Sequence, residues 1–153
     1  MAPIGKTKYS PELGAWNPYL NVSYLQFHPD DPDDVEWGAG LSRALNPIFS
    51  IALDSTWSRR AEGSFYGLSL IAEKPLAESL SSSLRVTQNL DHGYASEDYN
   101  GLNNTEAAIT LAWSEGGALS VYAGWEYSWA GEDVRRDGGG DQHWGQIGLM
   151  LYF

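Results

Sequence analysis

Apolar and polar residues alternate along most of this chain with a period of two. In the clearest stretch the odd-numbered residues from Leu119 to Trp129 are apolar or aromatic, while the even-numbered residues from Ser120 to Ser128 are mostly small or polar. Such alternation is typical of β-strands with one apolar face. Eight stretches show it and are predicted to be strands: residues 15–27, 35–44, 48–58, 64–72, 79–90, 105–113, 119–129 and 142–153.

The connections between these stretches alternate in length. Short connections follow the second, fourth and sixth stretches, at residues 45–47, 73–78 and 114–117. Longer or more polar connections follow the others, at residues 28–34, 59–63, 91–104 and 131–141. Because short turns at one end and long loops at the other are typical of membrane barrels, we predict an all-β fold, an eight-stranded antiparallel up-and-down transmembrane β-barrel over residues 14–153. Residues 1–13 are predicted to be a periplasmic N-terminal extension.

The character of the two faces suggests which one looks outward. The polar face is mostly Ser, Gly, Ala, Asn and Thr, which suits a narrow interior better than a water-facing surface. The apolar face suits lipid, with aliphatic residues in the middle and aromatic residues toward both ends. Those aromatic residues are Tyr24, Trp37, Trp57, Tyr66, Trp125, Tyr127 and Trp129 toward the long loops, and Trp16, Phe49, Trp113 and Phe153 toward the short turns. A soluble barrel with an aromatic core has the same period and remains the alternative.

Composition narrows the function further. The chain has 153 residues, which suits one domain, and a net charge of −11, which disfavours non-specific binding to nucleic acid. It has no cysteine, so disulfides and thiolate metal sites are excluded. No apolar run is long enough for a membrane helix. No signal peptide precedes Met1, so we expect a mature form with an added start methionine. The acidic loop at Asp30–Asp34 lacks the spacing of a known calcium loop, and we predict neither a metal site nor a cofactor.

The last eight residues resemble the assembly signal of bacterial outer-membrane proteins. Gln146, Gly148, Leu151 and Phe153 fit its polar residue, its glycine two positions later, and its two hydrophobic positions at the chain end. The resemblance implies insertion by the barrel-assembly machinery into the outer membrane of a Gram-negative bacterium. The partners it implies are outer-membrane lipid and lipopolysaccharide. In size and layout the whole chain resembles the small eight-stranded outer-membrane barrels, without matching one family among them.

Four charged residues fall on the polar face: Glu36, Asp54, Arg85 and Glu126. A charge inside a narrow barrel is costly unless it is paired or hydrated. We therefore predict a salt-bridge cluster around Arg85, with Asp54 as its expected partner because the two lie at similar depth. The cluster is interpreted as a structural plug. The alternative is a gate or narrow path in a small cation-preferring channel.

The segment from Glu126 to Gly131 faintly resembles the lipid A deacylase barrels. That family carries a His-x-Ser pair, in which the histidine activates a serine nucleophile. Here Ser128 matches the serine, but Glu126 stands at the histidine position, and a carboxylate is a weak base for serine unless its pKa is raised. An outer-leaflet lipid-modifying hydrolase therefore stays an alternative. A histidine from the long loops, His28, His92 or His143, would be needed to complete it.

Two basic pairs lie in long loops on the same side of the predicted barrel, Arg59–Arg60 and Arg135–Arg136. Guanidinium groups match phosphate geometry, so these loops are candidates for contact with lipopolysaccharide, although ordinary loop solubility explains them too. Together the observations favour a non-enzymatic barrel with a structural or surface-interaction role, a filled interior, at most a narrow conductance, and a possible protein partner at the loops. A designed origin is a further alternative, but the irregular acidic loops are unlike the minimal turns of designed barrels.

Overall fold

The computed structural model describes residues 5–9, 15–26, 33–95, 100–115 and 119–151. These residues form nine strands in one antiparallel sheet, whose spatial order is the order of the chain. One short helix lies between the last two strands. The elements are β1 (Gly5–Tyr9), β2 (Asn17–Leu25), β3 (Asp34–Ala44), β4 (Phe49–Ser58), β5 (Gly63–Ala77), β6 (Leu80–His92), β7 (Asn100–Glu115), β8 (Leu119–Ala130), α1 (Glu132–Arg136) and β9 (Gln142–Leu151).

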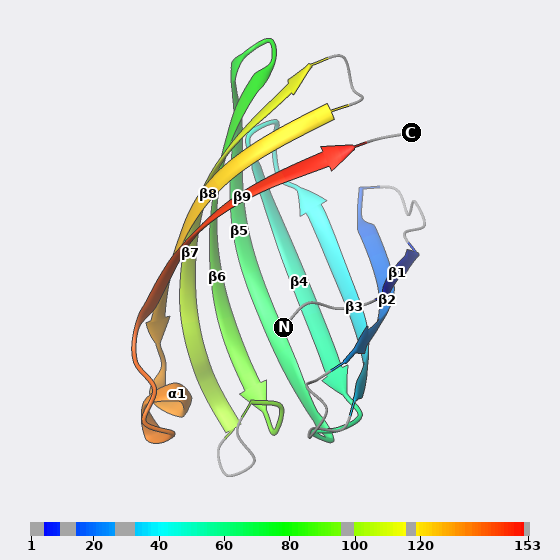
Figure 1. The fold of residues 1–153 in the computed structure, drawn as a ribbon, viewed down its shortest axis with the longest axis vertical. Helices are drawn as coiled ribbons and strands as arrows, with labels where there is room; N and C mark the ends of the chain where they lie inside the picture. The colour runs from blue at the N-terminus through cyan, green and yellow to red at the C-terminus, as the bar shows by residue number, and fades with distance from the viewer. Residues whose placement is uncertain (1–4, 10–14, 27–32, 96–99, 116–118, 152–153) are drawn as a thin grey trace.

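Strands β2 to β9 are the eight strands predicted from the alternation, so the all-β, antiparallel, up-and-down arrangement is confirmed. They have between 9 and 16 residues. Strand β7 begins at Asn100, inside the segment predicted as a loop over residues 91–104. The helix α1 was not predicted, and it lies with the long connections at the bottom of Figure 1, while the β5–β6 turn lies at the top. Among the described residues no helix is long and apolar enough to span a membrane.

The sheet is strongly curved but does not close (Figure 1). Its first strand is β1 and its last is β9, and no strand pair joins these two edges in the described part of the chain. The predicted eight-stranded closure would need β9 to pair with β2. That edge of β2 is instead held by β1, which pairs Gly5 with Tyr24 and Tyr9 with Leu20. The N-terminal segment was expected outside the sheet, and its residues 5–9 form a strand that the alternation did not predict.

The distribution of polar and apolar residues is inverted relative to a water-soluble protein. Among the described residues, Ala108 is the one buried hydrophobic residue. Large apolar side chains are exposed along the middle of the strands, including Leu53 at 52 %, Leu70 at 49 % and Ile109 at 53 %. The buried polar residues are Ser23, Asp34, Ser58, Ser69, Thr87, Asn89, Asp91, Asn103, Asn104, Glu126, Ser128 and Asp133. The inside of the curve is therefore the polar face, and the outside is apolar.

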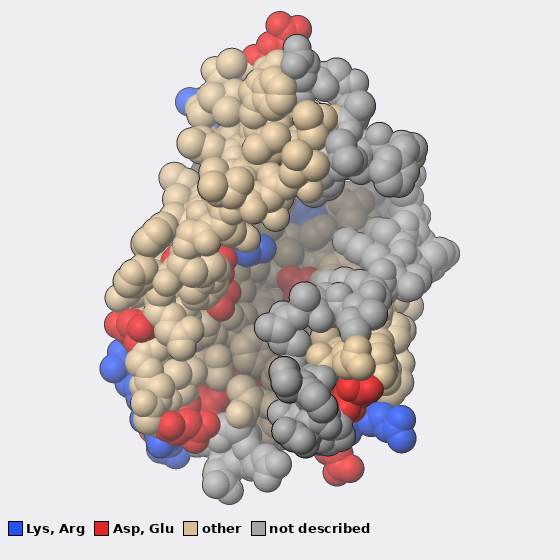
Figure 2. All heavy atoms as spheres, in the orientation of Figure 1, with Lys and Arg blue, Asp and Glu red and all other residues tan. Residues whose placement is uncertain are grey.

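The outer surface also sorts by charge. Figure 2 shows many Lys, Arg, Asp and Glu side chains at the end of the molecule where α1 lies, and others at the opposite tip and inside the hollow, with a largely uncharged outer surface between the two ends. Aromatic pairs lie on the outer face toward the same end. The ring centroids of Trp37 and Trp57 are 5.0 Å apart, and those of Tyr127 and Trp129 are 4.7 Å apart. On β3, β4 and β8, aromatic residues therefore lie between the apolar middle of the strands and the charged end.

Candidate functional site

The polar interior is densely bonded at the long-loop end. Asp34 is only 5 % exposed, and its carboxylate accepts hydrogen bonds from the Ser58 hydroxyl at 2.6 Å and from the backbone N–H of Arg60 at 2.9 Å. The Ser58 hydroxyl in turn accepts the backbone N–H of Ala61 at 2.9 Å. Asp34 thus fastens the β4–β5 turn onto the start of β3. The sequence placed Asp34 in an acidic loop, and the structure shows it as a buried group that holds the turn; residues 28–32 of that loop lie outside the described part.

Glu36, one of the four predicted interior charges, accepts a hydrogen bond from the Tyr94 hydroxyl. The Tyr94 ring also packs on Phe65, with ring centroids 5.6 Å apart. This contact explains why Phe65 interrupts the polar face of β5: it supports a tyrosine that crosses the interior. Burial, followed by the hydrogen bond to Glu36, raises the pKa of Tyr94. The phenol therefore stays protonated and donates to Glu36 at neutral pH.

An amide network continues across β6, β7 and β8. The Asn89 side chain donates to Asn104 Oδ1 at 3.0 Å, and Asn104 Nδ2 donates to Ser128 Oγ at 2.6 Å and to Glu106 Oε1 at 2.7 Å. Asn89, Asn104 and Ser128 are each less than 10 % exposed. Buried polar groups satisfied in this way rigidify the strands that carry them.

The predicted cluster around Arg85 has a different membership from the one expected. Arg85 lies 4.0 Å from Glu126, whose side chain is 9 % exposed, and Glu126 also faces Glu106 on the neighbouring strand. Asp54, which was expected to pair with Arg85, accepts a hydrogen bond from the Tyr19 hydroxyl. The interior charges are therefore distributed over separate partners, and the arginine pairs with Glu126 of β8.

A β-bulge at Asn103 builds the contact between the sheet and α1. The register of β6 and β7 shifts between Asn89 and Leu90, so Asn103 and Asn104 are both buried although they are consecutive. A bulge re-aims a side chain in this way. Asn103 Nδ2 donates to Asp133 Oδ2 at 2.9 Å, and Asp133 is 1 % exposed. Burial, opposed by the Asn103 hydrogen bond and reinforced by the nearby Asp91 carboxylate, raises the pKa of Asp133.

The short-turn half of the interior is more open. A cavity of about 270 Å³ is lined by polar groups that include Arg85, Thr110 and Gln146. It shares Glu73 and Tyr122 with a wider space of about 570 Å³ beside the β5–β6 turn. Arg85, at 49 % side-chain exposure, is the innermost charge of this vestibule. The interior is thus a hollow that ends on the bonded layer at the long-loop side.

The hydrolase alternative finds no support from the described part of the chain. Ser128 lies on the polar face, bonded to Asn104. His143 is the register partner of Tyr127 on the outer face, and its ring stacks on Trp125 at 5.3 Å. His92 is exposed at the end of β6. His28 lies outside the described residues. Neither described histidine joins Ser128, so the serine has no activating base there.

The basic loop residues divide into two groups. Arg135 bonds to Asp141 at 3.1 Å, and Arg136 bonds to Glu132 at 2.6 Å, so both close local ion pairs around α1. Arg59 and Arg60 are exposed in the β4–β5 turn. At the other end of the molecule the Arg43 guanidinium lies 5.3 Å from the centroid of the Trp16 ring.

The assembly-signal residues belong to the last strand. Gly148 is the position over which the Tyr122 ring lies, and a Cβ there would overlap that ring. Gln146 borders the interior cavity. Leu151 ends β9, and Phe153 lies outside the described residues.

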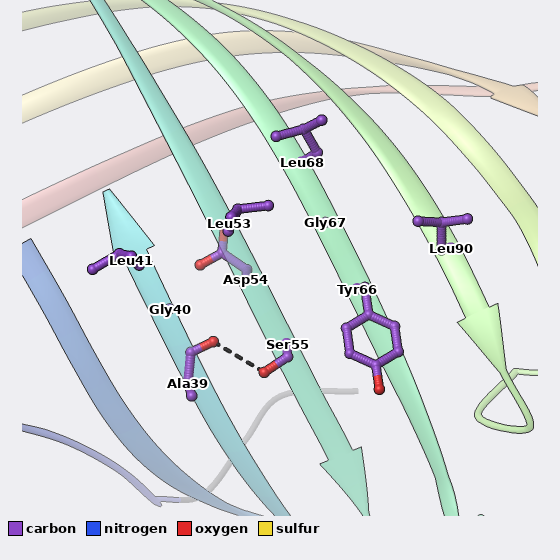
Figure 3. A pocket seen from close by; sticks show the side chains of 10 residues that line it. All are labelled: Ala39, Gly40, Leu41, Leu53, Asp54, Ser55, Tyr66, Gly67, Leu68 and Leu90. Carbon is purple, nitrogen blue, oxygen red and sulfur yellow. Dashed lines mark hydrogen bonds between the residues drawn. The ribbon is translucent and has the colours of Figure 1, made fainter. Parts of the chain in front are cut away.

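The outer face carries a shallow apolar depression, shown in Figure 3. It has a volume of about 400 Å³ and opens where the small residues Ala39 and Ser55 lie between leucines of β3, β4 and β5. The Ser55 hydroxyl donates to the carbonyl of Ala39 at 3.3 Å, so its polar group is satisfied within the sheet. The depression is therefore apolar in character although a serine lines it.

Several residues of the interior were missed by sequence reasoning. Glu106 shares the parity of Ala108 and Thr110 and was detectable as a fifth inward charge. Tyr19 and Tyr94 were harder to predict from the sequence, because the sequence does not show which residue a tyrosine on a polar face, or in a loop, will contact. Comparison of the chain with known protein families, with curated proteins and with solved structures found no match.

Proposed function

We propose that this chain is an outer-membrane β-barrel of a Gram-negative bacterium, with a structural or surface-interaction role and an interior that side chains fill at its long-loop end. The observation that carries the proposal is the inverted burial, with exposed leucines, isoleucines and tryptophans outside and hydrogen-bonded polar groups inside. In water this arrangement would leave a continuous apolar surface, which marks an interaction with lipid or another apolar partner. In lipid the sheet would have to close, because a closed sheet satisfies its own backbone groups.

The aromatic residues favour lipid over a protein partner. They lie toward the ends of the strands on the outer face, as in Trp37, Trp57 and Trp129, while aliphatic residues such as Leu70 and Ile109 lie between them. Trp and Tyr concentrate at membrane interfaces because their rings are amphipathic. The depression of Figure 3 is bordered by leucines, so its apolar surface suits contact with a lipid acyl chain.

The interior favours a structural role over transport. At the long-loop end, Asp34 and Asn104 are bonded to side chains of other strands and Glu36 to Tyr94 beyond the end of β6, and these bonds would obstruct a path through the interior. The exposed β4–β5 turn carries Arg59 and Arg60, whose guanidinium groups suit contact with lipopolysaccharide phosphates. The barrel-assembly machinery would insert the chain, reading the signal that ends at Phe153.

The test is refolding from urea into phospholipid vesicles and, separately, into buffer without lipid. We expect a band whose gel mobility shifts on heating only after refolding into vesicles. Folding in buffer alone to a monomeric, cooperative state would refute the membrane proposal. Tryptophan fluorescence gives an independent readout, because the outer tryptophans shift to shorter wavelength on contact with lipid.

A small cation-preferring channel remains the second candidate, favoured by the polar vestibule that ends on Arg85. Planar-bilayer recording separates it from the structural role. We expect an inserted but silent barrel. Discrete current steps that change with Arg85→Ser would replace the structural role with conduction.

A further inference from the structure

The polar groups in the short-turn half of the interior differ from those of the bonded layer. Five hydrogen-bonding side chains border the cavity of about 270 Å³: Ser83, Arg85, Thr110, Tyr122 and Gln146. No hydrogen bond joins any of these five side chains to another residue of the described part of the chain. The amide network at the long-loop end uses its donors and acceptors internally, whereas the cavity leaves its own for a bound molecule.

Strand register explains why these groups surround one space. Ser83, Thr110, Gly124 and Gln146 are successive register partners, so they form one row on the inner face from β6 to β9. Gly124 has no side chain, and a Cβ there would lie 3.2 Å from Thr110 Oγ1 and 3.3 Å from Gln146 Nε2. The space over Gly124 is therefore flanked by a hydroxyl group on β7 and an amide group on β9.

The next row toward the long loops supplies the charged group. Arg85, Ala108 and Glu126 are successive register partners in that row. Arg85 Nη2 lies 4.0 Å from Glu126 Oε2, which is longer than an N–H···O hydrogen bond. Glu126 thus balances the charge of the guanidinium group without occupying its N–H donors. The Arg85 side chain is 49 % exposed, so these donors are accessible from the cavity.

The next row toward the short turns supplies an aromatic ring at the entrance. Tyr122 lies on β8 between its register partners Ala112 and Gly148, and its ring packs against Gly148. Tyr122 borders both the cavity and the wider space of about 570 Å³ beside the β5–β6 turn. A molecule that enters from the short-turn end therefore passes this ring before it reaches Arg85.

The charges around the cavity favour a neutral occupant. An anion bound to Arg85 would meet the carboxylate of Glu126 beside the guanidinium group and that of Glu73 on the cavity wall. A cation would meet the guanidinium group itself. A neutral molecule with several hydroxyl groups suits these surroundings, because each hydroxyl both donates and accepts hydrogen bonds. The volume lies just below the range of about 300–1,000 Å³ for pockets that hold drug-sized ligands, which limits the occupant to about one ring.

We propose that this cavity binds a neutral, hydroxyl-rich solute of the size of a single sugar ring, which enters from the short-turn end. The Arg85 guanidinium donates to its hydroxyl groups on one side, and the Thr110 hydroxyl and Gln146 amide bind it on the other. The Tyr122 ring packs against its C–H groups. The bonded layer at the long-loop side stops the solute, so the site is a pocket and not a passage. The inference goes beyond the proposed membrane role and does not depend on it, because these groups share one face of the sheet.

Binding is measured by equilibrium dialysis of radiolabelled D-glucose, D-galactose and D-mannose against the protein refolded in vesicles, with empty vesicles as background. We expect saturable binding of at least one of the three. D-Glucuronate and D-glucosamine have a similar ring with a negative or a positive charge, and we expect both to bind more weakly. Tighter binding of either charged sugar would overturn the neutral class of ligand. The absence of saturable binding of all three neutral sugars would overturn the site.

Two conservative substitutions test whether the cavity is the place of binding. Arg85→Lys keeps the charge beside Glu126 but removes the guanidinium donors, and we expect an affinity about tenfold lower. Thr110→Val removes one hydroxyl group at nearly constant size, and we expect a loss of about fivefold. The matched controls are Arg43→Lys and Thr56→Val, which lie outside the cavity and should keep the parent affinity. Parent affinity in both cavity variants would overturn the assignment.

Thiol protection tests the site without removing any of its proposed contacts to Arg85, Thr110 or Gln146. The chain has no cysteine, so Ser83→Cys places a single thiol on the cavity wall. Ser114→Cys is the control, because Ser114 is exposed near the β7–β8 turn and lines neither space. We expect the bound sugar to slow modification by a water-soluble thiol reagent at position 83 and not at position 114. Equal rates with and without sugar at position 83 would overturn the proposal.

The two proposals fail in different ways. Loss of the heat-shifted band in vesicles counts against the membrane barrel, and the sugar assays then apply to the protein folded in buffer. A shifted band without sugar binding keeps the membrane barrel and removes the pocket.

Discussion

Replacing Leu70 by arginine distinguishes a lipid-facing wall from a water-facing one by the sign and size of its effect. Leu70 is the central residue of β5, with seven residues on either side, and its side chain is 49 % exposed. Its register partners are Ile51 and Val86, so the change falls in the middle of the apolar wall. If that wall faced water, the substitution would change stability by no more than about 0.5 kcal/mol, as at most surface positions. At the midplane of a bilayer, arginine on a barrel costs about 2–4 kcal/mol.

The assay is equilibrium unfolding by urea of the protein in vesicles, followed by the folded fraction on unheated gels. With a slope of about 2 kcal/mol/M, the expected loss lowers the midpoint by about 1–2 M. Leu45→Arg is the matched control, because Leu45 is 54 % exposed but lies in the β3–β4 turn. We expect the control midpoint to move little. A Leu70→Arg protein with the midpoint of the control would refute the lipid-facing assignment.

Two further predictions concern the interior and α1. Gly148→Ala places a Cβ against the Tyr122 ring, and overpacking of this kind lowers stability by about 1–3 kcal/mol. Gly140→Ala is the neutral control, because Gly140 has open space around it. Equal unfolding midpoints for the two variants would contradict the packing argument. Asp133→Asn tests the buried carboxylate beside Asp91: because the pKa of Asp133 is raised in the folded protein, its favourable contribution is complete at acid pH and is lost as pH rises through that pKa. Hydrogen exchange of α1 should therefore speed up with pH beyond its intrinsic rate in the parent protein but not in the asparagine variant, and a parallel pH response in both would remove Asp133 as the cause.

The period of two was sufficient to predict the strands from β2 to β9 and the face that each residue occupies. It succeeded because one face of every strand is apolar, so a shift by one residue would exchange the two environments completely. It failed where that condition fails. At Asn103 the bulge inserts an extra residue, so the alternation loses its phase and the start of β7 was assigned to a loop. Strand β1 has no apolar alternation, and its pairing with β2 is visible only in three dimensions.

The partners of interior charges were beyond the reach of the sequence for a different reason. Parity places Asp54, Arg85 and Glu126 on the inner face, but which pair forms depends on the stagger between strands that are not consecutive. The structure sets Arg85 beside Glu126 across β7, while Asp54 is bonded to Tyr19. Alternation fixes the direction of a side chain and leaves its height relative to distant strands undetermined.

Closure is the property for which local pattern and surroundings have to be considered together. Backbone groups at an open sheet edge can bond to water when water is present, so water alone does not require the sheet to close. Water does not compensate in this way for the exposed apolar side chains of Ile147 and Leu149, or for the apolar wall of which they are part. Transfer to lipid reverses both effects: contact of the apolar wall with its surroundings becomes favourable, and each unpaired backbone group at a sheet edge becomes costly. The alternation therefore specifies strand order and face, while closure of the sheet depends also on the solvent in which it lies.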